Sequence, residues 1–226
     1  MLRPDHCGTK FSTMTQDLSR IRREYAQKTL SKTVVSADPS EQLKSWIDEA
    51  IHCKAGDSTA MSLATADSEG KPSARIVLLK EITEEGLIFY TNYHSTKGKQ
   101  MDANPWAAVV FYWHELERQV RVEGSVEMTS EEKSDEYFQS RPESSKLGAW
   151  ASDQSSAVPN RSYLENRLQE LTEEFSDHPI PRPPHWGGYT IKPWRFEFWQ
   201  GRENRLHDRI EYYLYDEGWK IQRLAP

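Results

Sequence analysis

Alternating apolar and polar positions dominate the middle of the chain, and this is the pattern of strands with one buried face. In the stretch from Arg118 to Met128, valines alternate with charged residues. Strands of similar length are expected at four further places, residues 60–65, 73–80, 86–91 and 107–113. Five closely spaced strands with mainly hairpin-length connections predict an antiparallel barrel or sandwich.

Three helices are also predicted, one before these strands and two after them. Residues 38–56 open with Asp-Pro-Ser, carry apolar residues on one face and end at Ala-Gly, which predicts an amphipathic helix. A capping box, Thr129-x-x-Glu132, predicts a helix that runs to about Ser140 and stops before Pro142. A third helix is expected from about Asn160, because leucines recur on one stripe after it.

The last part of the chain returns to strand-like runs, at residues 189–191, 195–199, 205–215 and 219–223. Gly201 to Asn204 has the residue types of a tight turn. Arg205, His207 and Arg209 are therefore expected on one face of the following strand, since side chains two apart share a face. Two guanidiniums and an imidazole on one face repel each other unless an anion lies over them. A solvated strand face is the alternative.

Composition limits the classes of function. The 226 residues fit one barrel or sandwich domain, or two small ones, and the net charge of -6 argues against general nucleic-acid binding. Any basic site must therefore be local. The two cysteines and seven scattered histidines lack the spacing of a disulfide framework or a metal site, so no metal is expected.

The N-terminal segment is expected to be more mobile than the rest of the chain. Residues 1–38 are interpreted as a mobile N-terminal arm and residues 39–226 as a single domain. Within the arm, residues 18–25 are either a short basic helix or a solvated charged turn. No apolar run approaches the roughly 20 residues that span a bilayer, and the start lacks a secretory signal. A cytoplasmic protein is expected, with mitochondrial targeting by residues 1–17 as the alternative.

Basic residues beside hydroxyl groups recur along the predicted sheet, and such groups hold phosphates. Arg75 and Lys80 flank an apolar strand that would point them to opposite faces, so that each would hold a different phosphate. Protection against edge pairing is the alternative. The stretch from Ser95 to Lys99 combines hydroxyls, free backbone N–H groups and Lys97, which is a phosphate cradle or else a solvated loop. The Walker spacing is absent, which weighs against nucleotide hydrolysis.

Two further groups of residues could bind a phosphorylated or heterocyclic ligand. Tyr137, Arg141 and Ser145 follow at steps of four and form a phosphate-monoester grip, with surface packing as the alternative. The amides of Gln119 and Gln154 suit the edge of a heterocycle, although such residues also bond loops. No catalytic nucleophile or carboxylate pair stands out. Phosphate grips and aromatics without acid–base pairs indicate that a cofactor supplies the chemistry.

One ordered set of short motifs extends from the basic stretch at Leu18 to the C-terminus. Its members are Arg22–Tyr25, Arg75–Lys80, Phe89–Asn92, Glu117–Val120, Tyr137–Pro142, Gln154–Ser156, Phe198–Gly201, Arg205–Arg209 and Arg223–Pro226. By this set the chain resembles the pyridoxine (pyridoxamine) 5'-phosphate oxidase family, FMN enzymes that make pyridoxal 5'-phosphate. The first 17 residues lie outside the resemblance.

The resemblance implies a mainly β fold with peripheral helices, an antiparallel split β-barrel that forms a homodimer with FMN at the subunit interface. The residues that it assigns to FMN are Arg75, Ile76, Val77, Leu78, Tyr90, Thr91, Thr96, Lys97, Gln119, Gln154, Ser155, Trp199 and Arg209. The residues that it assigns to the substrate phosphate are Lys80, Tyr137, Arg141 and Ser145. Those at the substrate ring are Arg205, Leu206 and His207, and those of an arm that closes over the site are Arg22, Arg23, Glu24 and Tyr25. One departure is Thr96-Lys97 where the family often has Arg-Lys, which removes a cation from the FMN phosphate grip.

The activity implied is the oxidation of pyridoxine 5'-phosphate and pyridoxamine 5'-phosphate by dioxygen, which yields pyridoxal 5'-phosphate and hydrogen peroxide in vitamin B6 metabolism. Arg205 and His207 are the catalytic candidates: they would hold the substrate ring over the flavin, and Arg205 would assist proton removal from the C4' substituent. One alternative is a split-barrel FMN reductase of another substrate, in which the Tyr137–Arg141–Ser145 grip would be idle. The other is a non-catalytic carrier of flavin or pyridoxal phosphate.

Overall fold

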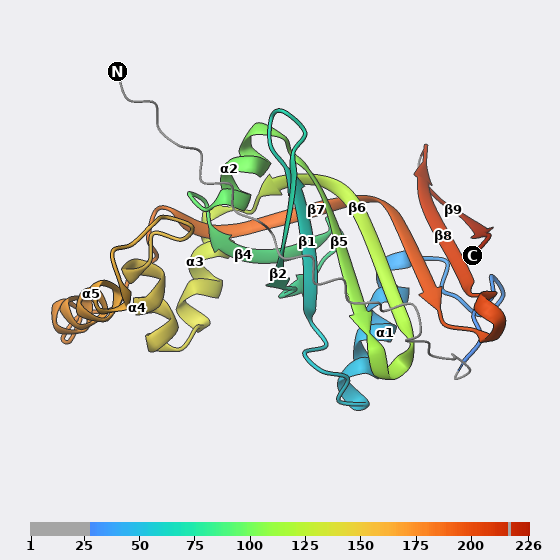
Figure 1. Cartoon of the computed structure of the whole chain (residues 1–226), viewed down its shortest axis with the longest axis horizontal. Coiled ribbons are helices and arrows are strands. Elements are labelled where there is room, and N and C mark those ends of the chain that lie inside the picture. The colour runs from blue at the N-terminus through green and yellow to red at the C-terminus, as the bar shows by residue number, and fades with distance from the viewer. Residues whose placement is uncertain (1–27, 217) are drawn as a thin grey trace, which may run out of the picture.

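A curled antiparallel sheet runs through the computed structural model, which describes residues 28–216 and 218–226 (Figure 1). Its strands are β1 Ala60–Ala66, β2 Pro72–Leu78, β3 Glu81–Ile82, β4 Leu87–Asn92, β5 Trp106–Trp113, β6 Arg118–Met128, β7 Trp186–Gln200, β8 Asp208–Tyr215 and β9 Gly218–Leu224. Along the sheet their order is β2-β1-β5-β6-β7-β4-β3, and β8 and β9 continue from β7. The expectation of a mainly β, antiparallel fold is confirmed.

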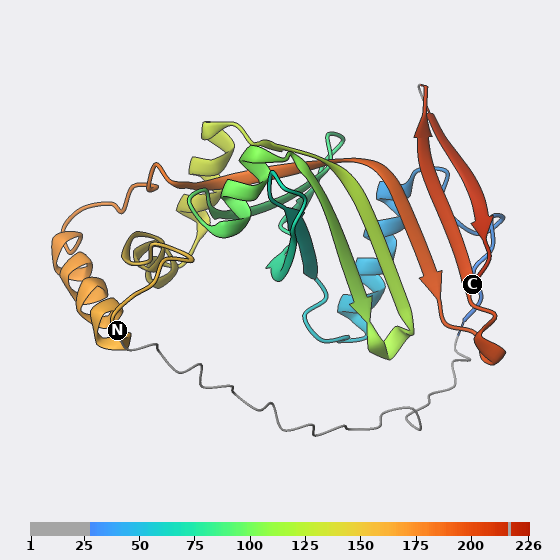
Figure 2. The same cartoon turned by 45° about the horizontal axis from the view of Figure 1, so that its top comes forward.

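Five helices accompany the sheet in the described residues. They are α1 Pro39–His52, α2 Thr96–Ala103, α3 Glu131–Ser140, α4 Glu143–Ala151 and α5 Arg161–Glu174. Figures 1 and 2 show α3, α4 and α5 gathered at one end of the sheet and the β8–β9 hairpin at the other. The sequence predicted α1, α3 and α5 but not α4. No helix among the described residues is both long and apolar enough to cross a membrane.

Strand β7 changes partners halfway along its 15 residues. Its first part pairs with β4 and its last part with β8, while β6 runs beside both. At the change the register with β6 shifts between Glu123 and Gly124, opposite Pro193. A Cβ atom on Gly124 would lie 2.3 Å from the carbonyl oxygen of Lys192, so the bend requires glycine there. The runs at 189–191 and 195–199, predicted as two strands, are therefore one bent strand.

The main core fills the concave side of the sheet. Val120 and Val122 of β6 are fully buried, as the alternation predicted, and Phe196 and Phe198 of β7 lie beside them. Trp46 of α1 contacts Phe198 edge-on with 5.2 Å between ring centroids. Each such side chain contributes about 1.5–3 kcal/mol by leaving water, which fixes α1 against the sheet.

A second, smaller core holds the helices α3–α5 against the start of β7. It consists of Phe138, Leu147, Leu171, Ile180 and Trp186. The capping prediction for α3 is corrected by one residue, because Ser130 rather than Thr129 accepts the backbone N–H of Lys133, at 3.2 Å. The Thr129 hydroxyl instead bonds the hydroxyl of Ser134 at 2.9 Å.

Residues 28–38, the described end of the predicted arm, lie against the C-terminal strands. Leu30 is buried, and its backbone N–H donates to the Asp208 carboxylate at 3.0 Å. Arg223 of β9 donates to the carbonyl oxygen of Leu30 at 2.8 Å. These bonds place the described end of the predicted arm beside the start of β8. The basic stretch predicted at 18–25 lies outside the described residues.

Candidate active site

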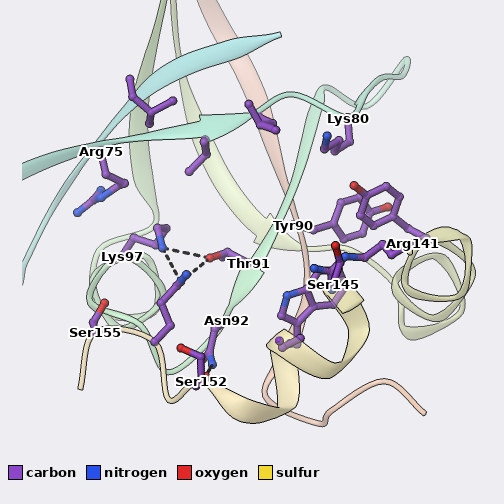
Figure 3. A pocket seen from close by; sticks show the side chains of 18 of the residues that line it. Arg75, Lys80, Tyr90, Thr91, Asn92, Lys97, Arg141, Ser145, Ser152 and Ser155 are labelled. Atoms are coloured by element: carbon purple, nitrogen blue, oxygen red, sulfur yellow. Dashed lines mark hydrogen bonds between the residues drawn. The ribbon is translucent and has the colours of Figure 1, made fainter. Parts of the chain in front are cut away.

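A cavity of about 1090 Å³ lies between β2, β4, α2, α4 and the loop after α4 (Figure 3). It brings together residues that the sequence had selected from five separate segments. These residues are Arg75, Ile76, Val77, Leu78, Lys80, Tyr90, Thr91, Thr96, Lys97, Tyr137, Arg141, Ser145, Gln154 and Ser155. Figure 3 shows Arg75 and Lys97 near one end of the cavity and Lys80 and Arg141 near the other.

Lys97 lies in the first turn of α2, a helix capped by Ser95, whose hydroxyl accepts the N–H of Gly98 at 3.3 Å. The buried ammonium donates to Gln154 Oε1 at 2.8 Å and to Thr91 Oγ1 at 3.1 Å. Burial and, to a smaller extent, the charge of Arg75 lower the pKa of Lys97 to about 8. Among the described residues Lys97 has no carboxylate partner, so its charge is available to a bound anion.

Arg75, on β2, also has only neutral partners in the described chain. Its guanidinium donates to the Leu63 carbonyl at 3.3 Å, to Thr65 Oγ1 at 2.6 Å and to Gln100 Oε1 at 3.3 Å, and it contacts the Ser73 hydroxyl as well. Burial lowers the pKa of Arg75. Arg75 and Lys97 are close enough for the charge of one to affect the other, and a phosphate bound by both would offset their repulsion.

At the other end of the cavity, Arg141 lies in the break between α3 and α4. Its guanidinium carbon lies 4.5 Å from the centroid of the Trp186 ring, a cation–π contact. Its Nη1 is buried and has no hydrogen-bond partner among the described residues. An unsatisfied buried donor costs about 1–3 kcal/mol, so an acceptor from a ligand is expected there. Burial also lowers the pKa of Arg141.

An aromatic wall stands beside this second cation. Tyr90 stacks on Tyr137 with 3.9 Å between ring centroids and lies 5.6 Å from Trp186, nearly parallel to it. Burial raises the pKa of Tyr90 to about 12, so its phenol stays protonated at neutral pH and can donate a hydrogen bond.

Between the two ends, β2 offers a flat apolar edge. Ile76 is 65% exposed and Leu78 is 37% exposed, and both line the cavity. Because β2 is the last strand at one edge of the sheet, its outward N–H and C=O groups have no strand partner in the described chain. Such an edge can bind the polar rim of a planar ring while the side chains contact its face.

The expectation that Arg75 and Lys80 point to opposite faces of one strand is wrong. Strand β2 ends at Leu78, and the backbone N–H of Lys80 donates to the Ile88 carbonyl of β4 at 2.9 Å. This crossing turns the chain, and both basic side chains line the same cavity.

A second group of selected residues does not line this cavity. Its members are Gln119, Trp199, Arg205, Leu206, His207 and Arg209. Three of them lie side by side across the sheet, because Gln119 pairs in register with Trp199, and Trp199 with Arg209. The His207 ring lies 4.7 Å from the Trp199 ring, centroid to centroid. The pKa of His207 is lowered by burial and by the charge of Arg205.

The prediction that Arg205, His207 and Arg209 share a strand face is also wrong. Strand β8 begins only at Asp208, and Arg205 ends a 3-10 turn with a positive φ of 59°. Local hydrogen bonds stabilise this turn, since His207 Nδ1 accepts the N–H of Arg202 at 3.1 Å and Asp208 accepts the Arg202 side chain. The polar residues therefore form a compact turn in place of an extended strand.

Sequence reasoning missed several residues of the cavity wall. Asn92, Ser152 and Trp186 line it, and Ser73 lies beside Arg75. Trp186 precedes Gly187 and Gly188, and a Cβ atom on Gly188 would lie 2.8 Å from the Tyr90 ring. The Trp-Gly-Gly sequence was the signal that could have indicated this close approach of the backbone to Tyr90.

Two protein-family models match two successive parts of the chain. A model described as pyridoxamine 5'-phosphate oxidase matches residues 47–174, more than half of the chain. The chain belongs to the pyridoxamine 5'-phosphate oxidase family. A second model, the pyridoxine 5'-phosphate oxidase C-terminal dimerisation region, matches residues 186–226. The family resemblance inferred from the motifs is thus confirmed, and Trp199 to Arg209 lie within the dimerisation region.

Relatives in the family are similar over almost their entire length. The chain is 52% identical to a pyridoxine/pyridoxamine 5'-phosphate oxidase of Cyanothece sp., over 94% of this chain and 100% of that protein. It is 55% identical to pyridoxine/pyridoxamine 5'-phosphate oxidase 1 of Ralstonia nicotianae, over 92% and 99%. Among solved structures, PhzG from Burkholderia lata, in complex with tetrahydrophenazine-1-carboxylic acid, has a TM-score of 0.83 at 30% identity and covers 88% of this chain and 98% of its own.

Proposed function

We propose that the protein is an FMN-dependent oxidase that converts pyridoxine 5'-phosphate and pyridoxamine 5'-phosphate to pyridoxal 5'-phosphate. Dioxygen is the electron acceptor and hydrogen peroxide the second product. The observation that carries the proposal is the presence of two separate cation groups, Arg75 with Lys97 and Arg141 with Lys80, in one cavity with an aromatic wall. Two phosphorylated molecules with planar rings match this arrangement, and membership of the family supports it.

The residues at the first end fit the phosphate of FMN. Arg75 and Lys97 supply two charges that no carboxylate of the described chain neutralises. Thr91, Gln154 and Ser155 lie beside Lys97, and the outward edge of β2 would bind the flavin ring. FMN held by these residues would supply the redox chemistry, which is hydride acceptance from C4' of the substrate and two-electron transfer to dioxygen.

The residues at the second end fit the substrate phosphate. The unsatisfied Nη1 of Arg141 would donate to a phosphate oxygen, and the hydroxyls of Tyr137 and Ser145 and the ammonium of Lys80 complete the grip. A substrate held by its phosphate at one end and its ring at the other has few orientations left. Its reacting carbon would thereby be placed beside the flavin, which would lower the entropic part of the activation barrier.

We infer that each active site is built from two subunits of a homodimer. Gln119, Trp199, Arg205, His207 and Arg209 lie outside the cavity of their own chain. All but Gln119 fall in the region that matches the family's dimerisation model. The simplest arrangement has them complete the cavity of the partner subunit, where Trp199, Arg209 and Gln119 would contact FMN.

Arg205, Leu206 and His207 are then the residues at the substrate ring. The lowered pKa of His207 keeps its imidazole neutral near pH 7, so that it can donate to or accept from the pyridine substituents. Arg205, exposed at the tip of its turn, would hold the ring over the flavin and assist removal of the proton from the hydroxyl or amine substituent on C4'. For the amine substrate, water replaces the nitrogen, which leaves as ammonia.

A second candidate is an enzyme that acts on a tricyclic carboxylate. It follows from the similarity of the chain to PhzG, whose solved structure contains such a molecule. A guanidinium such as Arg141 binds a carboxylate as well as a phosphate.

The test of the proposed function is to incubate the FMN-loaded protein in air with pyridoxine 5'-phosphate and to quantify pyridoxal 5'-phosphate and hydrogen peroxide. The oxidase forms both in equal amounts. A carrier, or an enzyme of another substrate, forms neither above the rate with free FMN.

A further inference from the structure

Gln100 of α2 occupies a position between the helix and the first two strands. Its side-chain oxygen, Oε1, accepts three hydrogen bonds: from Thr65 Oγ1 at 2.6 Å, from Ser73 Oγ at 2.8 Å and from Arg75 Nη2 at 3.3 Å. The donors come from β1 and β2, so that one amide joins the helix to both strands. The side chain lines no part of the cavity itself.

The same helix carries the second cation of the phosphate grip. Lys97 lies three residues before Gln100, one turn away on α2, and its ammonium faces the cavity. Arg75 comes from β2. The contact between Gln100 and Arg75 therefore connects the two elements whose cations must converge on one phosphate, and it fixes the guanidinium from the side away from the ligand.

The chemical nature of the acceptor matters as much as its place. An amide oxygen accepts hydrogen bonds without a formal charge, whereas a carboxylate of the same length would form an ion pair with the guanidinium. All four acceptors around Arg75 in the described chain are neutral: a backbone carbonyl, two hydroxyls and this amide. The guanidinium is thus held in place while its full charge remains for a ligand.

We propose that Gln100 is a positioning residue that aims Arg75 at the phosphate of FMN and that its neutrality preserves the charge of Arg75 for that phosphate. The inference rests on the proposed FMN site. It assigns to Gln100 a role in selecting the phosphorylated flavin over its dephosphorylated form. Riboflavin, which has the same ring and ribityl chain without the phosphate, is the natural probe of that role.

The experiment measures dissociation constants of FMN and riboflavin for the apoprotein, by quenching of flavin fluorescence, in the parent and in Gln100→Glu. The carboxylate can accept the same three hydrogen bonds but neutralises Arg75. We expect the FMN constant to rise at least tenfold and the riboflavin constant to change less than twofold. If both constants stay within twofold of the parent, or both rise together, the positioning role is wrong, because damage to the fold would weaken both ligands alike.

Lys99→Gln is the matched control. It removes one positive charge from the same helix, as Gln100→Glu adds one negative charge, but Lys99 is exposed and lies outside the cavity wall. We expect its FMN constant to stay within threefold of the parent. A loss as large as that of Gln100→Glu would assign the effect to the general field of the helix and overturn the proposal.

Gln100→Met keeps the test decisive if the glutamate variant does not fold. Methionine has a similar length and cannot accept the three hydrogen bonds, so Arg75 loses its support. We expect a loss of preference for FMN over riboflavin of at least threefold, and an unchanged preference would contradict the proposal. Failure of the FMN site itself is distinguishable, because the parent apoprotein would then bind FMN no more tightly than riboflavin.

Discussion

Arg141 lies over the indole ring of Trp186, with 4.5 Å between the guanidinium carbon and the ring centroid, and its buried Nη1 has no partner in the described chain. The ring holds one face of the guanidinium, and the helix break holds its backbone. One nitrogen is thereby left for a ligand at the end of the cavity opposite to Lys97 (Figure 3).

Replacement of this arginine tests the substrate phosphate grip. Arg141→Met keeps much of the packing on Trp186 but removes the charged donor, whose bond to a phosphate is worth about 1.5–3 kcal/mol. We expect kcat/KM for pyridoxine 5'-phosphate to fall about 10- to 100-fold, mainly through KM, with FMN affinity unchanged. Arg161→Met, at an arginine whose side chain is 88% exposed on α5, is the control and should leave the kinetics unaltered. An Arg141→Met enzyme with parental KM would refute the assignment.

The lowered pKa of Lys97 predicts a pH dependence of FMN binding. The free site has a pKa of about 8, and a phosphate dianion favours the protonated amine. FMN affinity should therefore be constant between about pH 7 and the pKa, and it should fall towards tenfold per unit as pH rises further. Lys97→Arg keeps the charge at every pH, so its affinity should stay flat over the same range. A parental affinity that is flat up to about pH 10 would contradict the pKa and the role together.

Replacement of Arg205 tests the role of the turn before β8. Arg205→Leu removes the group proposed to hold the substrate ring and assist proton removal, so kcat for pyridoxine 5'-phosphate should fall well beyond threefold while FMN stays bound. A turnover within about threefold of the parent corresponds to roughly 0.7 kcal/mol of barrier and would exclude the role.

Mixed dimers test whether one site is built from two subunits. Arg141→Met and Arg205→Leu chains, each of strongly reduced activity alone at a substrate concentration below the parental KM, are unfolded, mixed in equal amounts and refolded together. If the two residues of one site come from different chains, half of the dimers are mixed and each has one intact site, so that about a quarter of the parental activity returns. If both residues come from one chain, every site in a mixed dimer carries a substitution, and no activity is regained.

Much of the fold was readable from the sequence because local rules agreed with the tertiary structure. Strand β6 was predicted with its observed ends, since its alternation continues from Arg118 to Met128. Helix α1 was equally clear from Asp38, whose side chain caps it. Helix α4 was missed because Ser, Gly and Ala dominate it, and these residues give little periodic signal. The bend of β7 at Pro193 looked like a strand end, because only the partner exchange from β4 to β8 keeps the strand continuous.

The sequence predicted the charged residues of the candidate site but missed several residues that line its wall. Arg75, Lys97 and Arg141 could be selected because each is a cation near hydroxyl groups within a motif of the family resemblance, and all three line one cavity. Trp186 and Gln100 could not, because their roles depend on partners distant in sequence, 45 residues away for Arg141 and 35 for Thr65. The strand face proposed for Arg205 and His207 was wrong because His207 and Asp208 accept local hydrogen bonds from Arg202, which hold these residues in a turn before β8.

The central claim, that a phosphorylated substrate donates its hydride to FMN held in this cavity, is tested most directly without air. FMN-loaded protein is mixed anaerobically with pyridoxine 5'-phosphate while the visible absorption band of the flavin is recorded, and air is then admitted. We expect the band to disappear with one equivalent of substrate and to return with air, and we expect no loss with unphosphorylated pyridoxine at the same concentration. A flavin band that persists with pyridoxine 5'-phosphate, or that disappears equally with pyridoxine, would contradict the account.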